Sequence, residues 1–157
     1  MNIVIGSDHA GFRLKQELAD WLRAAGHLVD DIGSHTPDQV DFPDIALALC
    51  GKVREDAGRR GILVCGTGVG AVIAANKING IRAAVCHDIH SAHQGVEHDD
   101  VNVMCMGAQI VGPWLARDLV DTFLRARFVQ DEDFVRRVDK LNRLEQQNAT
   151  GRTHGHE

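Results

Sequence analysis

The chain has 157 residues, of which 44% are hydrophobic and 25% charged, and its formal net charge is -5. This length fits one domain with its own core and is too short for a separate cofactor domain. The acidic balance gives no electrostatic reason to expect nucleic acid or an anionic membrane as a partner, and no apolar run is long enough to span a bilayer. We therefore expect a protein that acts on a small molecule.

The cysteines indicate the compartment. Cys50, Cys65, Cys86 and Cys105 are widely spaced and contain no Cys-x-x-Cys pair. No basic-then-apolar leader precedes the first predicted strand. We expect a protein of the reducing cytoplasm.

Short β-rich runs alternate with helical periodicity from end to end, which is typical of an α/β protein with a parallel sheet and helices on both faces. The predicted strands cover residues 2–6, 27–32, a run that begins at Ile62, 81–86 and 102–106. The predicted helices lie at 14–25, ended by Gly26, at 44–56, capped near Asp44, after Gly70, at about 90–97, from Pro113, and at 132–147.

The last predicted helix has a narrow apolar stripe of Phe134, Val138 and Leu141. A terminal helix of this pattern often packs across a partner subunit, so we expect a dimer at least. Residues 148–157 have no apolar residue beyond Ala149, which predicts a disordered tail after a single domain of residues 1–147.

The most informative stretch is Ile62–Cys65 followed by a glycine-rich segment that ends at Gly70. An apolar run of this kind predicts a central parallel strand, and the glycines allow a sharp turn into a helix whose N–H groups point at a bound anion. A thiol at this junction lies at the positive end of the helix dipole, which favours thiolate. Cys65 is therefore a candidate base or nucleophile.

Other interpretations of this stretch compete. A Cys-x5-Arg phosphatase loop is excluded, because Ala71 stands where the arginine would bind phosphate. A dinucleotide-binding turn stays open: Gly66, Gly68 and Ala71 match its pattern, and Asp88 follows as a ribose ligand, which would make the chain a nucleotide-binding, flavodoxin-like module. A buried cysteine used as a small apolar residue also stays open. We favour an anion hole for negative charge that develops on oxygen during a reaction driven by Cys65.

Ligands of open parallel sheets bind beyond the carboxyl ends of the strands. Polar residues gather there by topology: Asp8 and His9 after the first strand, the Cys65 segment after the third, and His87 and Asp88 after the fourth. His98 precedes the fifth strand, so it enters such a site only from a neighbouring subunit.

Five segments carry a family resemblance: residues 6–12, 41–44, 65–70 with 74–77, 80–83, and 98–103. Together they resemble the type B ribose-5-phosphate isomerases and the galactose-6-phosphate isomerase subunits, over nearly the whole chain. The resemblance implies a three-layer, Rossmann-like fold with a five-stranded parallel sheet and helices on both faces. It also implies a homodimer or dimer of dimers, with the C-terminal helix and the active site at the subunit interface, and neither metal nor organic cofactor.

The chemistry implied by the resemblance is aldose–ketose isomerisation of ribose 5-phosphate, or a related sugar phosphate, through an enediolate, with Cys65 as the base. The residues agree, because main-chain amides of Gly66, Gly68, Val69 and Gly70 can stabilise the enediolate oxygen. By resemblance His98 and Thr67 assist opening of the sugar ring, while Asp8 holds sugar hydroxyls. From the sequence alone, a surface role for His98 and a helix-capping role for Asp8 stay open.

The phosphate end departs from the family. Gln109 and Asp133 stand where the resemblance implies phosphate-binding arginines, and Asp99 stands where an asparagine often holds a sugar oxygen. His9 and Arg137, with Arg136 nearby, remain as candidate phosphate ligands. A different sugar, or one without phosphate, therefore stays open as the substrate.

A metal site is the remaining alternative. His87, Asp88, His90, His93 and His98 form a dense cluster in the sequence. Zinc sites want defined ligand pairs on one helix face, and this spacing is loose beside those patterns, so we expect no metal.

Overall fold

One parallel sheet organises residues 1–150, the part of the chain that the computed structural model describes. Its strands are β1 (Asn2–Ser7), β2 (Leu28–Asp31), β3 (Arg60–Cys65), β4 (Ala83–Val85) and β5 (Val103–Gly107), in the spatial order β2-β1-β3-β5-β4. The helices are α1 (Phe12–Ala24), α2 (Phe42–Arg54), α3 (Val69–Ala75), α4 (Ile89–Asp99), α5 (Pro113–Arg125) and α6 (Glu132–Thr150). The predicted α/β fold with a five-stranded parallel sheet is confirmed.

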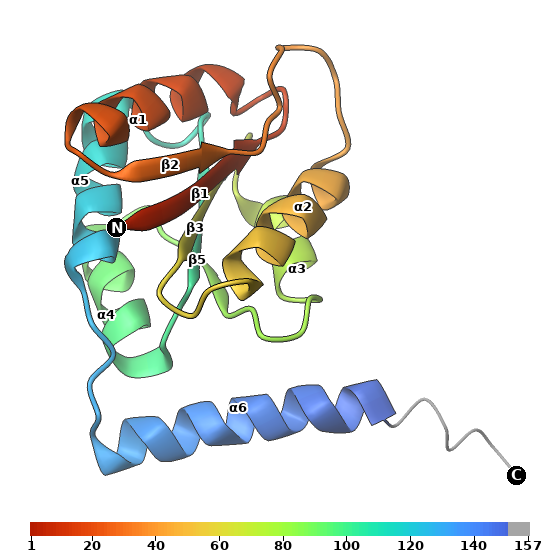
Figure 1. The fold of residues 1–157 in the computed structure, drawn as a ribbon, viewed down its shortest axis with the longest axis vertical. Coiled ribbons are helices and arrows are strands. Elements are labelled where there is room, and N and C mark those ends of the chain that lie inside the picture. Colours follow the sequence, from red (N-terminus) through yellow and green to blue (C-terminus); the bar gives the residue numbers. More distant parts are fainter. Residues whose placement is uncertain (151–157) are drawn as a thin grey trace, which may run out of the picture.

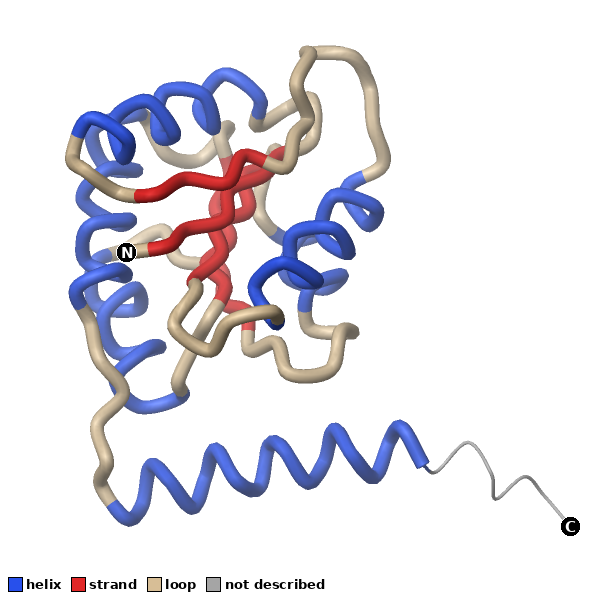
Figure 2. Tube along the Cα trace, in the orientation of Figure 1, coloured by secondary structure: helices blue, strands red, loops and turns tan. Residues whose placement is uncertain are grey.

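The sheet lies between two helical layers, α1, α4 and α5 on one face and α2 and α3 on the other (Figures 1 and 2). Alternation along the strands builds the two cores, because successive side chains point to opposite faces. On β3, Ile62 and Val64 face the first layer, while Leu63 and Cys65 face the second. Cys65 therefore lies at the carboxyl end of a central strand, on the side of α2 and α3.

Two helix ends can be compared with the predictions made from local sequence. Gly26 follows α1 with a φ of 88°, as a residue that ends a helix in the left-handed region does. The start of α2 differs from the prediction: its N-cap is Asp41 and not Asp44, and Asp41 makes no side-chain capping bond. Pro43 in the first turn has φ preset for a helix, which places the start ahead of Asp44.

The last helix, α6, lies outside the two helical layers, contacts α4, and crosses the end of the molecule where β5 begins (Figure 1). Val138 is its only buried residue within the described chain. The helix continues to Thr150, whose hydroxyl donates to the carbonyls of Gln146 and Gln147, so residues 148–150 are helical and not part of a disordered tail. The rest of that predicted tail, 151–157, lies outside the described residues.

The edge of the sheet at β4 is covered by one side chain. The amide nitrogen of Asn76 donates to the Ala83 carbonyl at 2.9 Å, and its amide oxygen accepts from the Ala83 N–H at 2.8 Å. Asn76 thus occupies hydrogen-bonding groups that a neighbouring strand would otherwise use. Among residues 1–150, no helix is both long and apolar enough to cross a membrane.

Candidate functional site

The Cys65 thiol is bound by the turn that follows β3. Its Sγ accepts a hydrogen bond from the Gly68 N–H at 3.0 Å, and the side chain is 6% exposed. Gly68 has a φ of 82° and is the N-cap of α3, so the turn closes back over the thiol. The Gly68 N–H therefore fixes the sulfur at the point where α3 begins.

Two glycines of the turn are in close contact with neighbouring residues, and one of them, Gly68, also has a left-handed backbone conformation. A Cβ on Gly68 would lie 3.2 Å from the Met106 carbonyl carbon, in a backbone conformation that side chains rarely adopt. A Cβ on Gly70 would lie 2.8 Å from the Phe42 ring. The turn is therefore packed between β5 and the start of α2.

The other cysteines are held as neutral thiols. Burial raises the pKa of Cys50 to about 12 and that of Cys86 to about 11, and it raises the pKa of Cys105 well above its ordinary value. Cys86 is within weak hydrogen-bonding distance of the Ala84 carbonyl. These three were predicted to be core residues, and all are buried. Cys65 is the described cysteine whose sulfur accepts a main-chain N–H.

Asp8 and His9 follow β1 at the same edge of the sheet. Asp8 is 9% exposed, and its Oδ1 accepts from the Gly11 N–H at 3.1 Å, at the start of α1. Asp8 therefore binds the N-cap residue Gly11, but α1 begins at Phe12 and has no side-chain cap, so the capping role left open for Asp8 is not the one it has. The exposed His9 accepts at Nδ1 from the Val40 N–H at 3.4 Å, which ties it to the loop before α2.

Thr67 and Gln109 join the same edge. The exposed Thr67 accepts at Oγ1 from the Val69 N–H at 3.3 Å. The Gln109 N–H donates to the Gly66 carbonyl at 3.0 Å, and the Gln109 side-chain amide is 3.3 Å from where a Gly66 Cβ would stand. The structure therefore brings Asp8, His9, Gln109 and the whole turn from Cys65 to Gly70 to one edge of the sheet.

His98, Asp99 and Arg137 lie at the opposite end of the same chain. His98 and Asp99 end α4, which runs back toward the residues that start β5. The ring of His98 stacks on Phe134 of α6, with ring centroids 4.0 Å apart. These three candidates do not meet Cys65 within one chain, as the topology predicted for His98.

The arginines of α6 share one carboxylate. Arg136 contacts Asp133 at 2.6 Å and Arg137 contacts it at 3.9 Å, and all three side chains are about half exposed or more. Exposed pairs of this kind contribute only about 0.2–1 kcal/mol each. Asp133 therefore partly neutralises the two arginines but does not hold them firmly.

The histidine cluster seen in the sequence is spread out in space. His93 pairs with Glu97 at 2.9 Å. Asp88 caps α4 by accepting from the Ser91 N–H and hydroxyl, and these hydrogen bonds lower the pKa of its carboxyl. In residues 1–150, no three His, Cys, Asp or Glu side chains gather as metal ligands would.

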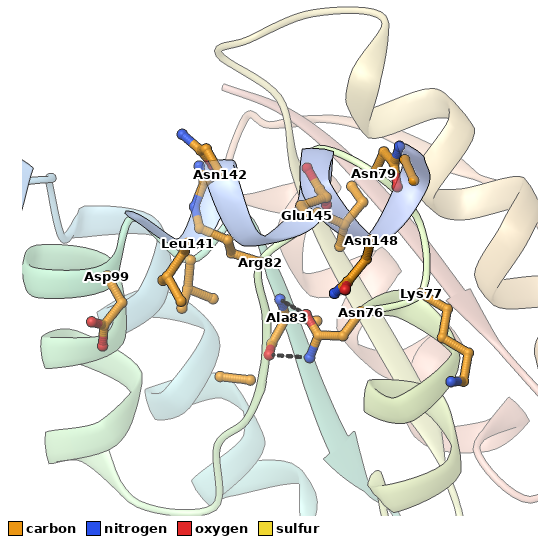
Figure 3. A pocket seen from close by; sticks show the side chains of 14 residues that line it. Asn76, Lys77, Asn79, Arg82, Ala83, Asp99, Leu141, Asn142, Glu145 and Asn148 are labelled. Carbon is orange, nitrogen blue, oxygen red and sulfur yellow. Dashed lines mark hydrogen bonds between the residues drawn. The ribbon is translucent and has the colours of Figure 1, made fainter. Parts of the chain in front are cut away.

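A cavity of the described chain lies away from Cys65. It measures about 800 Å³ and separates α6 from α3 and β4 (Figure 3). Glu145 reaches across one end to accept from the Gly80 N–H at 2.9 Å, and Asp99 is the predicted site residue that lines it. We take the Cys65 turn as the candidate site, because this cavity contains no thiol and only one of the predicted site residues.

Two residues of the Cys65 edge were not among the predicted site residues. Phe42 packs on Gly70, and His87 accepts at Nε2 from the Gly107 N–H at 2.9 Å. His87 was predicted to lie at this edge and was considered as a metal ligand, but no role at the site was predicted for it. The position of His87 directly after a strand was the signal that the sequence offered. Its hydrogen bond to Gly107 joins residues twenty apart in the chain, and no periodic pattern in the sequence indicates such a contact.

Comparison with known proteins agrees with this geometry. A family model described as Ribose/Galactose Isomerase matches residues 3–141. The chain is 40% identical over 148 residues to a ribose-5-P isomerase B of Listeria innocua, covering 94% of this chain and 99% of that one. It is 37% identical to a D-erythrulose-4-phosphate isomerase of Pectobacterium atrosepticum, covering 94% and 97%. The solved structure of Clostridium thermocellum ribose-5-phosphate isomerase B superimposes with a TM-score of 0.90 at 45% identity, covering 94% and 99%.

The Rossmann-like sheet with a thiol at its carboxyl edge, and these matches, define an aldose–ketose isomerase. The match over most of the chain favours this class over the nucleotide-binding module that the glycine pattern had left open. The chain belongs to the Ribose/Galactose Isomerase family.

Proposed function

We propose that this isomerase interconverts ribose 5-phosphate and ribulose 5-phosphate, or a closely related sugar phosphate, with Cys65 as the base. The observation that carries the proposal is the hydrogen bond from the Gly68 N–H to the Cys65 Sγ at 3.0 Å, at a site where a helix begins. Names of relatives at about 40% identity support the substrate class.

The proposed reaction needs one mobile proton and one stabilised oxygen. The Cys65 thiolate removes the proton from C2 of the open-chain aldose, and the electron pair passes to the carbonyl oxygen at C1 to form the enediolate. The same thiol then returns the proton to C1, the proton of the C2 hydroxyl passes to the oxygen at C1, and the oxygen at C2 becomes the ketose carbonyl. The first N–H groups of α3, at Gly70 and Ala71, have no acceptor in their own helix and are the proposed donors to the enediolate oxygen.

A second copy of the chain completes the proposed site. His98, Asp99 and Arg137 lie too far along the molecule to reach Cys65 of their own chain, and α6 exposes the apolar residues Leu141 and Leu144. A homodimer, or a dimer of dimers, would cover these residues and bring His98 to the substrate, where it and Thr67 would assist ring opening. Asp8 and Asp99 are the proposed ligands of sugar hydroxyls.

The phosphate end is the least conventional part of the proposed site. His9 and Arg137 remain as candidate ligands, while the neutral Gln109 lies beside the turn and Asp133 neutralises part of the charge on α6. A second candidate substrate follows, because a relative at 37% identity is named a D-erythrulose-4-phosphate isomerase. A four-carbon ketose phosphate is thus our alternative, and a sugar without phosphate is the third.

The test is an isomerisation assay of the purified protein, without added metal, on tetroses, pentoses and hexoses, each with and without a terminal phosphate. Preferential turnover of ribose 5-phosphate supports the first candidate. Preferential turnover of erythrulose 4-phosphate supports the second. Turnover of unphosphorylated sugars alone, or of none of the panel, would overturn the proposed substrate class.

A further inference from the structure

The sheet has an unusual junction where β4 stops short of β5. The last paired residues are Val85 of β4 and Cys105 of β5, and the Cys86 N–H then donates to the Cys105 carbonyl at 3.0 Å. Two residues further along β5, the N–H of Gly107 has no strand beside it on that side. The imidazole of His87 takes this place, accepting from Gly107 at Nε2 at 2.9 Å.

Gly107 is the support on which the Cys65 turn rests. It is the register partner of Cys65 across β3 and β5, and the next residue, Ala108, donates to the Cys65 carbonyl at 2.8 Å. The contact is so close that a Cβ on Gly107 would lie 2.6 Å from the Thr67 Cα and 2.7 Å from the Gly66 carbonyl oxygen. A shift of the Gly107 peptide would therefore move the backbone that carries the thiol and its donor.

We infer that His87 is a positioning residue for the isomerase reaction. Its neutral imidazole, with the proton on Nδ1 and the lone pair of Nε2 aimed at Gly107, holds the end of β5 and through it the turn from Cys65 to Gly68. The inference rests on the proposed role of Cys65 as the base. It adds a residue that touches neither the thiol nor the substrate but fixes the geometry between them.

Position and chemistry both favour this role over simple packing. His87 is only partly buried, so it fills no core cavity, while Gly107 is buried and depends on a donated lone pair. By strand alternation, His87 follows Val85 on the face of α2 and α3, which is the face of Cys65. Proton transfer to and from carbon demands accurate placement of the base, so a small displacement of the turn reduces the rate.

Side-chain length gives a matched set of variants. The amide oxygen of a glutamine reaches about as far from the main chain as histidine Nε2, whereas that of an asparagine reaches only as far as Nδ1. His87→Gln therefore keeps an acceptor within reach of the Gly107 N–H. His87→Asn keeps a polar side chain, but its amide oxygen is too short to reach that N–H. His87→Leu removes the acceptor altogether, and His90→Gln, on the exposed face of α4, is the control for losing a histidine.

The test measures kcat, KM and the exchange of the substrate C2 proton with solvent for these variants on whichever sugar phosphate the wild type turns over. We expect kcat and exchange to fall about tenfold or more in His87→Leu and His87→Asn with little change in KM, and His87→Gln to recover to within about threefold of wild type. His90→Gln should match wild type.

Two results would overturn the inference. One is wild-type kcat in both His87→Leu and His87→Asn, and the other is an equal loss in His87→Gln and His87→Asn at equal melting temperature. If His87→Leu does not fold, the comparison of His87→Gln with His87→Asn still tests the inference. A failure of the proposed function is recognised separately, because Cys65→Ala would then retain full exchange whatever the His87 variants do.

Discussion

The two ends of this molecule are built in different ways. At the carboxyl edge of the sheet, the Cys65 turn is fixed by main-chain bonds to Gly66, Gly68 and Ala108 and by contacts that leave no room for a Cβ. At the other end, α6 buries only Val138 among its described residues and is tied down by single contacts such as those of Glu145 and Phe134. The Cys65 end is fixed by contacts within one chain. At the α6 end, the candidate residues His98, Asp99 and Arg137 do not contact the Cys65 turn of their own chain.

This difference teaches where accuracy is needed. The atoms proposed to break and form C–H bonds belong to the rigid end, where backbone packing sets their positions. The groups proposed to open the ring and hold the phosphate belong to the loosely attached end, where a second copy would fix them. The predictions below break or sharpen this contrast, from the largest expected effect to the smallest.

Replacing Cys65 with alanine should lower C1–C2 proton exchange by about 10³-fold or more, because no other described base accepts a hydrogen bond from the turn. The fold should persist, since alanine fits where cysteine did, and circular dichroism and thermal melting check this. The buried Cys50→Ala variant is the control and should keep its exchange rate. Unimpaired exchange in Cys65→Ala would contradict its role as base.

Alkylation should distinguish the Cys65 thiol from the other three cysteines. A thiol with a pKa of about 11, such as Cys86, or about 12, such as Cys50, is thiolate in about one molecule in a thousand or fewer at pH 8. We therefore expect iodoacetamide at pH 8 to modify Cys65 first, by about 10²-fold in rate, as read by peptide mass spectrometry. All four should react in denaturant. Equal labelling of Cys50 and Cys65 in the native protein would count against the assignment.

Subunit complementation tests whether the loose end serves a second copy. Cys65→Ala and His98→Asn should each be nearly inactive, yet their mixture, unfolded and refolded together, should recover about a quarter of wild-type activity, because half of the dimers are mixed and each carries one intact site. A mixture of Cys65→Ala with itself is the control. No recovery from a mixture that forms mixed dimers would place both residues in one chain's site.

Gly68→Ala should show how tightly the turn is held. The left-handed φ of 82° and the 3.2 Å approach to the Met106 carbonyl carbon predict a loss of about 1–2 kcal/mol in stability and about a tenfold loss in kcat. Gly51→Ala, in α2 with open space around it, is the matched control and should stabilise by about 0.5–1 kcal/mol. Chemical denaturation and initial rates measure both, and unchanged rates in Gly68→Ala would show a more adaptable turn.

Gln109→Arg should give the smallest effect. If Gln109 faces the phosphate, a guanidinium beside Gly66 should lower KM for ribose 5-phosphate by about three- to tenfold and leave unphosphorylated ribose unaffected. Gln109→Leu, which adds no charge, is the comparison. If the ratio of the KM for ribose 5-phosphate to the KM for ribose is the same in Gln109→Arg as in the wild type, the phosphate binds away from residue 109.

The fold was largely predictable because its signals are local. Each strand was predicted within one or two residues of its observed ends, and the rule that ligands bind beyond the carboxyl ends of parallel strands predicted that Asp8 and the Cys65 turn lie at one edge. The start of α2 was missed by two residues, because the cap was assigned to Asp44, whereas Pro43 favours a first turn that begins ahead of it. The end of α6 was missed because polar residues such as Asn148 continue a helix without adding to its apolar stripe.

The finer contacts of the site were not predictable from sequence, since they join residues far apart in the chain. The bond from Gly107 to His87 and the packing of Gln109 on Gly66 depend on how β5 sits beside β3 and β4. The position of α6 depends on groups such as Glu145 that follow no periodic pattern. The family resemblance supplied roles for His98 and Arg137, and the topology predicted that His98 reaches such a site only from a neighbouring subunit.

The side-chain amide of Asn76 has a consequence for how copies of this protein behave when crowded. By filling the hydrogen-bonding groups of Ala83, it removes two groups through which another strand could add to the sheet at β4. Strand addition between copies is therefore opposed at this edge of the sheet. A single asparagine thus helps to separate orderly assembly from aggregation.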